Sequence, residues 1–138
     1  FWKWVSNTTV ALCTGTAMYH WSMEGDSAPV KVFARDAALA NCQVIAYKTD
    51  AAMKWLCLIG IYATADKRIA GQMQLYSVDK KVSNAIEGHA AEFTPFNYEG
   101  KQITLFSFCS KGAENVAKLH IIEVGGQSGF QKRVTELP

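Results

Sequence analysis

The stretch from Gly71 to Ala90 constrains the fold of this chain more than any other. Met73 and Leu75 alternate with glutamines, and the turn-forming run Asp79-Lys80-Lys81 leads directly into Val82. Alternation of apolar and polar residues before such a turn, with a second β-type segment after it, is typical of two antiparallel strands. The stretch therefore predicts a β-hairpin.

Short apolar segments that stop at a carboxylate recur on both sides of this hairpin. They occupy positions 20–24, 75–79 and 119–123, and they end at Glu24, Asp79 and Glu123. Their spacing indicates a unit of about 40 to 50 residues, built of short strands, which is the length of a propeller blade or a kelch-type repeat.

Twelve short strands are predicted along the chain, in three sets of four. The unit 1–35 holds strands at 1–5, 9–13, 16–23 and 30–33; the unit 42–90 holds strands at 43–47 and 54–64 and the hairpin 71–86; and the unit 91–135 holds strands at 92–96, 102–109, 116–124 and 130–134. The strand at 54–64 is apolar on both faces, so both should be covered. The alanine-rich segment 34–41 is too short for a stable helix and is interpreted as a connector.

We therefore predict an all-β fold, a partial β-propeller of about three four-stranded blades, with 1–138 as a single domain fragment. A β-sandwich is the alternative, since many short strands with regular turns also suit it. The chain begins in mid-strand at Phe1, without an initiator methionine, as expected of a piece cut from a longer protein. Three blades cannot close a ring, so we expect the isolated piece to be marginally stable or to self-associate.

Composition and charge narrow the functional classes. The chain is 49% hydrophobic and 19% charged, which is typical of a packed globular core, and its net charge is +2 without a basic stripe. No nucleic-acid partner is therefore expected. The longest apolar run, 55–63, is too short to span a bilayer and no signal-type segment opens the chain, so we expect a soluble, unexported chain without direct membrane insertion.

Cysteine and histidine spacing predicts no metal, cofactor or catalytic residue. No close CxxC pair occurs, no two imidazoles share a ligand spacing, and no nucleophile signature is present. The thiols are expected to be reduced core residues. A cysteine-dependent enzyme remains an alternative, because four cysteines and three histidines could still meet in space; these are Cys13, Cys42, Cys57, Cys109, His20, His89 and His120.

Several longer segments together resemble one family. They are FWKW at 1–4, YHWSMEG at 19–25, MQLYSVD at 73–79, IEGHAA at 86–91 and KLHIIEVG at 118–125. In this order and register they resemble the amino-terminal domain of clathrin heavy chain, up to about Gly125. That domain is a seven-bladed propeller whose grooves bind short linear peptides of endocytic adaptors, so the resemblance implies that this chain corresponds to its middle blades. The groove for the best-known adaptor motif would lie before Phe1.

The resemblance also implies two sites within the chain. The groove for arrestin-type motifs corresponds to Trp55, Leu75, Lys80, Val82, Asn84 and Ile86, and part of the top site for Trp-containing motifs corresponds to Gln43 and Ile45. The chain has Lys80 where the family usually has arginine, and Asn84-Ala85 in place of Gln-Pro. A lysine offers a point charge rather than a bidentate contact.

The residues of the first site also suggest a peptide groove by themselves. Trp55, Leu75, Val82 and Ile86 could line an apolar slot between neighbouring blades, with Lys80 and Lys81 at its rim. An extended peptide with alternate apolar side chains and an acidic residue would match it. Affinity at such a small contact should be about micromolar to millimolar, with avidity adding to it in a lattice.

Taken together, the resemblance implies a non-enzymatic scaffold of the clathrin coat that recruits adaptors during endocytosis, vesicle formation and protein transport. It would act in the cytoplasm, on coated pits and coated vesicles. Its partners would be endocytic adaptors and the remaining blades and legs of the heavy chain, with light chains contacting only regions outside this piece. The alternative is a purely structural segment without a partner of its own.

Overall fold

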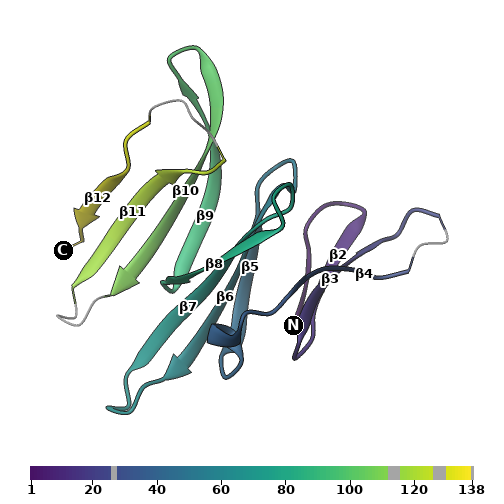
Figure 1. Cartoon of the computed structure of the whole chain (residues 1–138), viewed down its shortest axis with the longest axis horizontal. Helices are drawn as coiled ribbons and strands as arrows, with labels where there is room; N and C mark the ends of the chain where they lie inside the picture. The colour runs from purple at the N-terminus through teal and green to yellow at the C-terminus, as the bar shows by residue number, and fades with distance from the viewer. Residues whose placement is uncertain (26–27, 112–115, 126–129, 138) are drawn as a thin grey trace.

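A computed structural model describes residues 1–25, 28–111, 116–125 and 130–137. The chain forms three four-stranded antiparallel sheets in succession (Figure 1), here called the first, second and third blades. The first contains β1 (Trp2–Trp4), β2 (Thr9–Cys13), β3 (Ala17–Ser22) and β4 (Val30–Ala34). The second contains β5 (Gln43–Thr49), β6 (Trp55–Ala63), β7 (Ile69–Ser77) and β8 (Val82–Glu87). The third contains β9 (Ala90–Tyr98), β10 (Lys101–Lys111), β11 (Ala117–Glu123) and β12 (Arg133–Glu136).

Each blade is a simple meander, in which every strand pairs with its neighbours in the chain. This confirms the prediction of an all-β fold with three four-stranded units. The three sheets follow one another, rather than forming the two facing layers of a sandwich (Figure 1). The described helical segment is one 3-10 turn, η1 (Ala37–Leu39), within the predicted connector. No helix in the described part of the chain is long and apolar enough to cross a membrane.

The hairpin of β7 and β8 closes through a local network at Ser77. Lys81 donates its backbone N–H to the Ser77 carbonyl at 2.8 Å, and the Lys80 N–H donates to the Ser77 hydroxyl at 3.3 Å. Lys81 has a φ of 55°, in the left-handed region that tight turns require. The turn therefore holds two lysines at the tip of the second blade.

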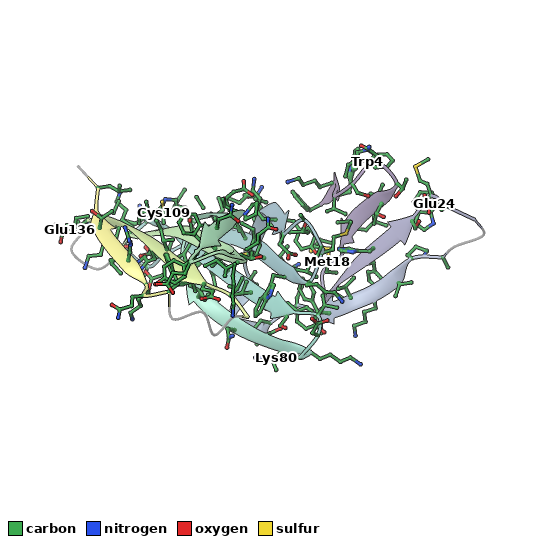
Figure 2. All side chains as sticks on the ribbon, turned by 90° about the horizontal axis from the view of Figure 1, so that it is seen from above. Trp4, Met18, Glu24, Lys80, Cys109 and Glu136 are labelled. Atoms are coloured by element: carbon green, nitrogen blue, oxygen red, sulfur yellow. The ribbon has the colours of Figure 1, made fainter. Side chains whose placement is uncertain are left out.

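The central strand β6 is covered on both faces, as predicted. Leu56 and Leu58 pack with Met18 and Phe33 of the first blade, while Cys57 and Ile59 belong to a separate cluster with the third blade. All four β6 side chains are at most 1% exposed. Figure 2 shows Met18 between the blades, whereas Trp4 lies at the margin of the first blade.

The last strand differs from its prediction. The sequence suggested a strand at 130–134, but β12 spans Arg133–Glu136 and pairs with β11 from Ile121↔Arg133 to Lys118↔Glu136. Phe130 does not enter the ladder; its ring makes edge-to-face contacts with Phe96 and Tyr98. Ring contacts with Phe96 and Tyr98 thus accompany a strand that begins three residues later than predicted.

Candidate functional site

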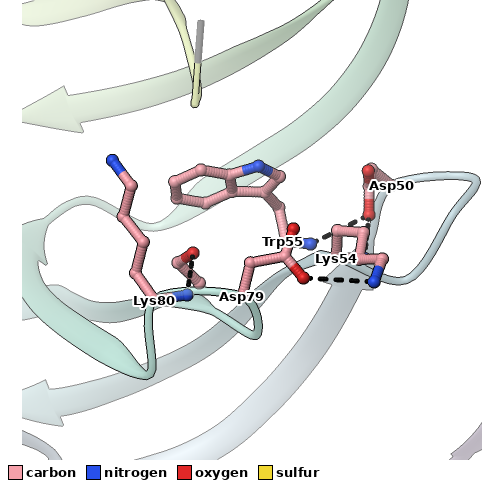
Figure 3. A network of polar contacts seen from close by, with 6 residues as sticks. Asp50, Lys54, Trp55, Asp79 and Lys80 are labelled. Carbon is pink, nitrogen blue, oxygen red and sulfur yellow. Dashed lines mark hydrogen bonds and ion pairs between the residues drawn. The ribbon is translucent and has the colours of Figure 1, made fainter.

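Trp55, the first residue of β6, is positioned by the side chain of Asp50 (Figure 3). The Asp50 Oδ1 atom accepts hydrogen bonds from the backbone N–H groups of Lys54 at 2.8 Å and Trp55 at 3.0 Å. Asp50 also donates its own N–H to the Trp55 carbonyl at 3.1 Å. Three hydrogen bonds through one aspartate therefore fix the point at which the tryptophan leaves the turn.

The Trp55 indole lies against Gly125, just after β11 of the third blade. A Cβ atom at Gly125 would lie 2.8 Å from indole Cζ2 and 3.0 Å from Nε1. Gly125 also has a φ of +68°, which side chains other than glycine rarely adopt. Glycine is thus needed here twice, for its backbone conformation and for the space that the indole occupies.

Five of the six residues predicted for the arrestin-type groove share one face of the second blade. The cross-strand ranks are Trp55–Ser77–Val82, Cys57–Leu75–Asn84 and Ile59–Met73–Ile86. Directly paired residues of antiparallel strands project to the same side of a sheet. Because Cys57, Ile59, Met73 and Leu75 pack with Phe93 and Phe106, this face is turned toward the third blade.

Burial falls steeply across this face from the inner to the outer strand. Leu75 on β7 is only 4% exposed, whereas Val82 on the outer strand β8 is 49% exposed. Asn84 is also exposed and Ile86 is half-buried. The face thus combines a closed apolar floor with an open outer margin, an arrangement that could receive apolar side chains of an extended partner.

Lys80, the sixth predicted residue, lies on the turn beside this face. Its side chain and the Trp55 indole extend to the same side of the second blade (Figure 3). The neighbouring Asp79 forms an ion pair with Lys54, with Nζ and Oδ1 3.1 Å apart. Neither Lys80 nor Lys81 forms an ion pair with a carboxylate of the described residues. The margin near Trp55 is therefore cationic.

The two residues predicted for the top site do not meet in one hollow. Ile45 lines an open hollow of about 1130 Å³, whereas Gln43 lines a separate one of about 420 Å³ beside Arg35. The pairing of β5 with β6 shifts between Val44 and Ala46. Such a bulge changes the direction of the side chains around it. This irregularity, which the sequence did not reveal, is a local reason why Gln43 and Ile45 line different hollows.

The larger hollow lies at the opposite end of the second blade from Lys80, and none of the six residues of the arrestin-type groove lines it. Its apolar lining includes Ile61, Tyr62 and Ile69, of which Ile69 is 72% exposed. Sequence analysis did not select these three residues. The signal available was weak, because apolar residues at strand ends flanking a polar loop are common.

Sequence analysis also missed the opposing wall, which comes from the third blade. Phe106, Phe108 and Ile122 pack toward the second blade as part of the shared apolar cluster. Phe108 stacks on the His120 ring, with centroids 4.6 Å apart and planes 5° apart. His120 Nε2 lies 3.0 Å from Ser110 Oγ. The alternation of these apolar residues along β10 and β11 was visible in the sequence. The sequence did not show which blade they face.

Three of the four thiols have environments that differ from that of a catalytic cysteine. Burial raises the pKa of Cys13 and Cys42, and it raises the pKa of Cys57 to about 12. A cysteine nucleophile needs the opposite shift, toward the thiolate. Among residues 1–25, 28–111, 116–125 and 130–137, no group of three or more His, Cys, Asp or Glu side chains could hold a metal ion.

Known proteins are similar to this chain over nearly its whole length. Residues 39–79 match the clathrin propeller repeat family. Clathrin heavy chain 2 of Homo sapiens is 55% identical over 99% of this chain, and the probable clathrin heavy chain 1 of Caenorhabditis elegans is 52% identical over 100% of it. The clathrin heavy chain of Dictyostelium discoideum is 43% identical over 99% of it. The chain spans only 9%, 8% and 8% of these relatives, respectively. With this similarity along its length and a propeller repeat at its centre, the chain belongs to the clathrin heavy chain family.

Proposed function

We propose that this chain is part of a non-enzymatic, peptide-binding propeller of a clathrin coat, which recruits endocytic adaptors through short linear motifs. The observation that carries the proposal is the face formed by Trp55, Leu75, Val82, Asn84 and Ile86. At its margin lie two lysines that form no ion pair with any carboxylate in the described part of the chain. Family membership supports the cellular setting, the cytosolic side of coated pits and coated vesicles.

The chemistry of this face selects a peptide of a particular kind. Its buried floor suits leucine-like side chains at alternate positions of an extended peptide, because such side chains project to the same side. Lys80 and Lys81 suit an acidic residue, since Asp79 is already paired with Lys54. Few contacts are available, so single-site affinity should be about micromolar to millimolar and coat avidity would strengthen it.

A second surface supports assembly with further blades of a heavy chain. On the first blade, Trp2 and Trp4 pair with Leu12 and Val10 across the ladder and share the face turned away from the second blade. Trp2 is 65% exposed and Trp4 is 47% exposed. Two exposed tryptophans on one sheet face favour burial of that face against a neighbouring sheet. We assign this face to a preceding blade, and we place light-chain contacts outside this chain.

Charge reversal tests the peptide-binding proposal directly. Peptide affinity of the propeller that contains this chain would be measured by isothermal calorimetry, using a capped peptide with alternate leucines and one aspartate. The Lys80→Glu/Lys81→Glu variant should bind at least about tenfold more weakly, because attraction at the margin becomes repulsion. Lys101→Glu, at the exposed first residue of β10, is the matched control. Unchanged binding in the double variant would contradict the proposal and favour a purely structural segment.

A further inference from the structure

The turn that follows β3 in the first blade is built like the turn that follows β7 in the second blade. The Met23 N–H donates to the Thr8 carbonyl at 2.7 Å, and the Val78 N–H donates to the Lys54 carbonyl at 2.9 Å. In each blade this hydrogen bond joins the residue after the third strand to the residue before the second strand. Thr8 and Lys54 therefore occupy equivalent positions, and so do the residues that follow Met23 and Val78.

This equivalence shows that the first blade lacks an ion pair that the second blade has. Asp79, which follows Val78, pairs with Lys54, with Nζ and Oδ1 3.1 Å apart. Glu24 occupies the corresponding place after Met23, but the threonine at position 8 offers it no charge. Glu24 is exposed at the margin of the first blade (Figure 2) and forms no ion pair with a cation in the described part of the chain. Its negative charge is therefore available to a partner.

Strand β4, which follows this turn, carries an apolar row on the side of the second blade. Val30 pairs with His20, and the His20 Nε2 atom lies 2.8 Å from the Tyr47 hydroxyl of the second blade. Directly paired residues project to the same side of a sheet, so Val30 also faces the second blade. Burial along the row falls from Phe33, 5% exposed, through the half-buried Val32 to Val30, 66% exposed. The end of the row nearest the turn is thus open to solvent.

The second blade supplies the opposing wall, so both sides of this margin lie within the chain. Tyr76 stacks on Phe33 with ring centroids 4.9 Å apart, and Val78 packs against the same apolar cluster. Lys31 pairs with Tyr19, the neighbour of His20, and therefore projects to the other side of β4. The margin thus combines exposed apolar surface with a negative charge, whereas the margin beside Trp55 is cationic.

We propose that the margin formed by Val30, Tyr76 and Glu24 is a second docking site, which takes an extended segment with apolar side chains and one basic residue. Alternate apolar side chains of such a segment project to one side and can lie against Val30 and Tyr76. The free carboxylate of Glu24 attracts the basic residue. This site lies between the first and second blades and does not depend on the function proposed for the face between the second and third blades. The second blade thus separates two sites of opposite charge preference.

Two matched peptides test this charge preference. One is a capped hexapeptide with three leucines, two intervening serines and a terminal lysine, and the other has aspartate in place of the lysine. Isothermal calorimetry measures the binding of each to the propeller that contains this chain. Glu24→Lys should weaken binding of the lysine peptide about tenfold, because attraction becomes repulsion, without weakening binding of the aspartate peptide. Val30→Ser should weaken binding of the lysine peptide about three- to tenfold through lost apolar contact, whereas Lys80→Gln should not affect it.

Thr8→Lys rebuilds in the first blade the ion pair that the second blade has. The new lysine should occupy Glu24 and weaken binding of the lysine peptide about threefold, with Thr8→Gln as the neutral control. Glu99→Lys, on the exposed turn between β9 and β10, is the matched control for Glu24→Lys and should bind like the parent protein. These exposed substitutions should leave the melting temperature unchanged, so a loss of binding is separated from a loss of folding.

The two peptides also keep failure of this inference distinct from failure of the proposed function. The inference is wrong if the lysine peptide does not bind the parent protein, or if it binds Glu24→Lys and Val30→Ser as tightly as the parent. It is equally wrong if the two peptides compete for one site. Binding of the aspartate peptide through Lys80 would then still support the proposed function. Loss of lysine-peptide binding in Glu24→Lys and Thr8→Lys, but not in Glu99→Lys and Thr8→Gln, would support the second site.

Discussion

The two interfaces of the second blade are built differently. Toward the first blade, buried polar groups connect the sheets: the Gln74 side chain, 1% exposed, accepts from the Asp36 N–H at 2.8 Å and donates to the Ala34 carbonyl at 2.9 Å. Both interfaces contain an apolar cluster; toward the third blade it includes Met73, Leu75 and Phe106, and the ion pair beside it, Lys48–Glu92, is exposed rather than buried.

This difference explains how the second blade can be fixed against the first blade and still present an exposed margin on its other side. Hydrogen bonds are directional, so Gln74 and the Tyr47–His20 pair, at 2.8 Å, define one register between the first and second blades. Apolar packing is non-directional, and on the other side it is complete only over the inner strands. The outer margin, with Val82 49% exposed, is left for a partner.

The largest effect is expected from emptying the apolar interface. Phe106 is 0% exposed and contacts the rings of Phe93 and Phe108. Phe106→Ala should lower the free energy of unfolding by about 3–5 kcal/mol, through lost burial and the cavity that remains. Urea unfolding would measure this loss. Phe96→Ala, at a site 42% exposed, is the control, and an equal loss in both variants would show that the interface is not specifically packed.

A smaller loss should follow when the polar anchor is removed. Gln74→Leu retains apolar volume but leaves the Asp36 N–H, the Ala34 carbonyl and the Ser83 hydroxyl without their partner. Buried polar groups without hydrogen bonds cost about 1–3 kcal/mol each, so we expect a loss of about 2–3 kcal/mol after partial relaxation. Gln102→Leu, on the exposed start of β10, should be nearly neutral. A stabilised Gln74→Leu variant would refute the anchoring role.

Tyr47→Phe tests one hydrogen bond in the same interface. The Tyr47 ring is 0% exposed, and burial raises the pKa of its hydroxyl. Removing the hydroxyl should cost about 1 kcal/mol, because His20 loses its partner while the aromatic packing is retained. Thermal unfolding of the two proteins at neutral pH provides the measurement, and an unchanged melting temperature would show that water replaces the hydroxyl without cost.

Acid should weaken this interface through His20. Burial lowers the pKa of His20 in the folded state, so below the unfolded value of about 6.5 the unfolded chain binds the proton more readily. The stabilising contribution of the neutral ring is therefore present above about pH 6.5 and is lost as the pH falls toward the folded pKa. Melting temperatures measured across this range should fall less steeply in His20→Gln than in the parent protein. Parallel curves would contradict the assignment.

The smallest effect concerns the ion pair that joins the second and third blades. Lys48 Nζ lies 3.3 Å from Glu92 Oε2, and the two side chains are 31% and 61% exposed. Exposed pairs contribute about 0–1 kcal/mol, so Lys48→Gln should change the free energy of unfolding by less than about 0.5 kcal/mol. Urea titration in low and high salt would detect it; a loss above 2 kcal/mol would mean that charge, rather than apolar packing, holds this interface.

Much of the fold followed from local sequence patterns. Alternation around Met73 and Leu75 predicted the hairpin, and the doubly apolar segment 55–63 predicted a strand covered on both faces, because side-chain direction in a strand has a period of two residues. The exception is Phe130, whose ring contacts Phe96 and Tyr98 on a distant strand, while β12 begins three residues later than predicted.

For the candidate site, the sequence by itself determined one wall and its charge. The spacing of Val82, Asn84 and Ile86 places them on one face of β8, and the lysines are confined to the turn that precedes it. Only the tertiary structure decided that Gly125 meets Trp55, that His120 lies on the opposite wall, and that Gln43 and Ile45 line different hollows. The physical reason is that pleat and turn geometry are set by neighbouring residues, whereas the pairing of two sheet faces depends on packing between strands that are distant in sequence.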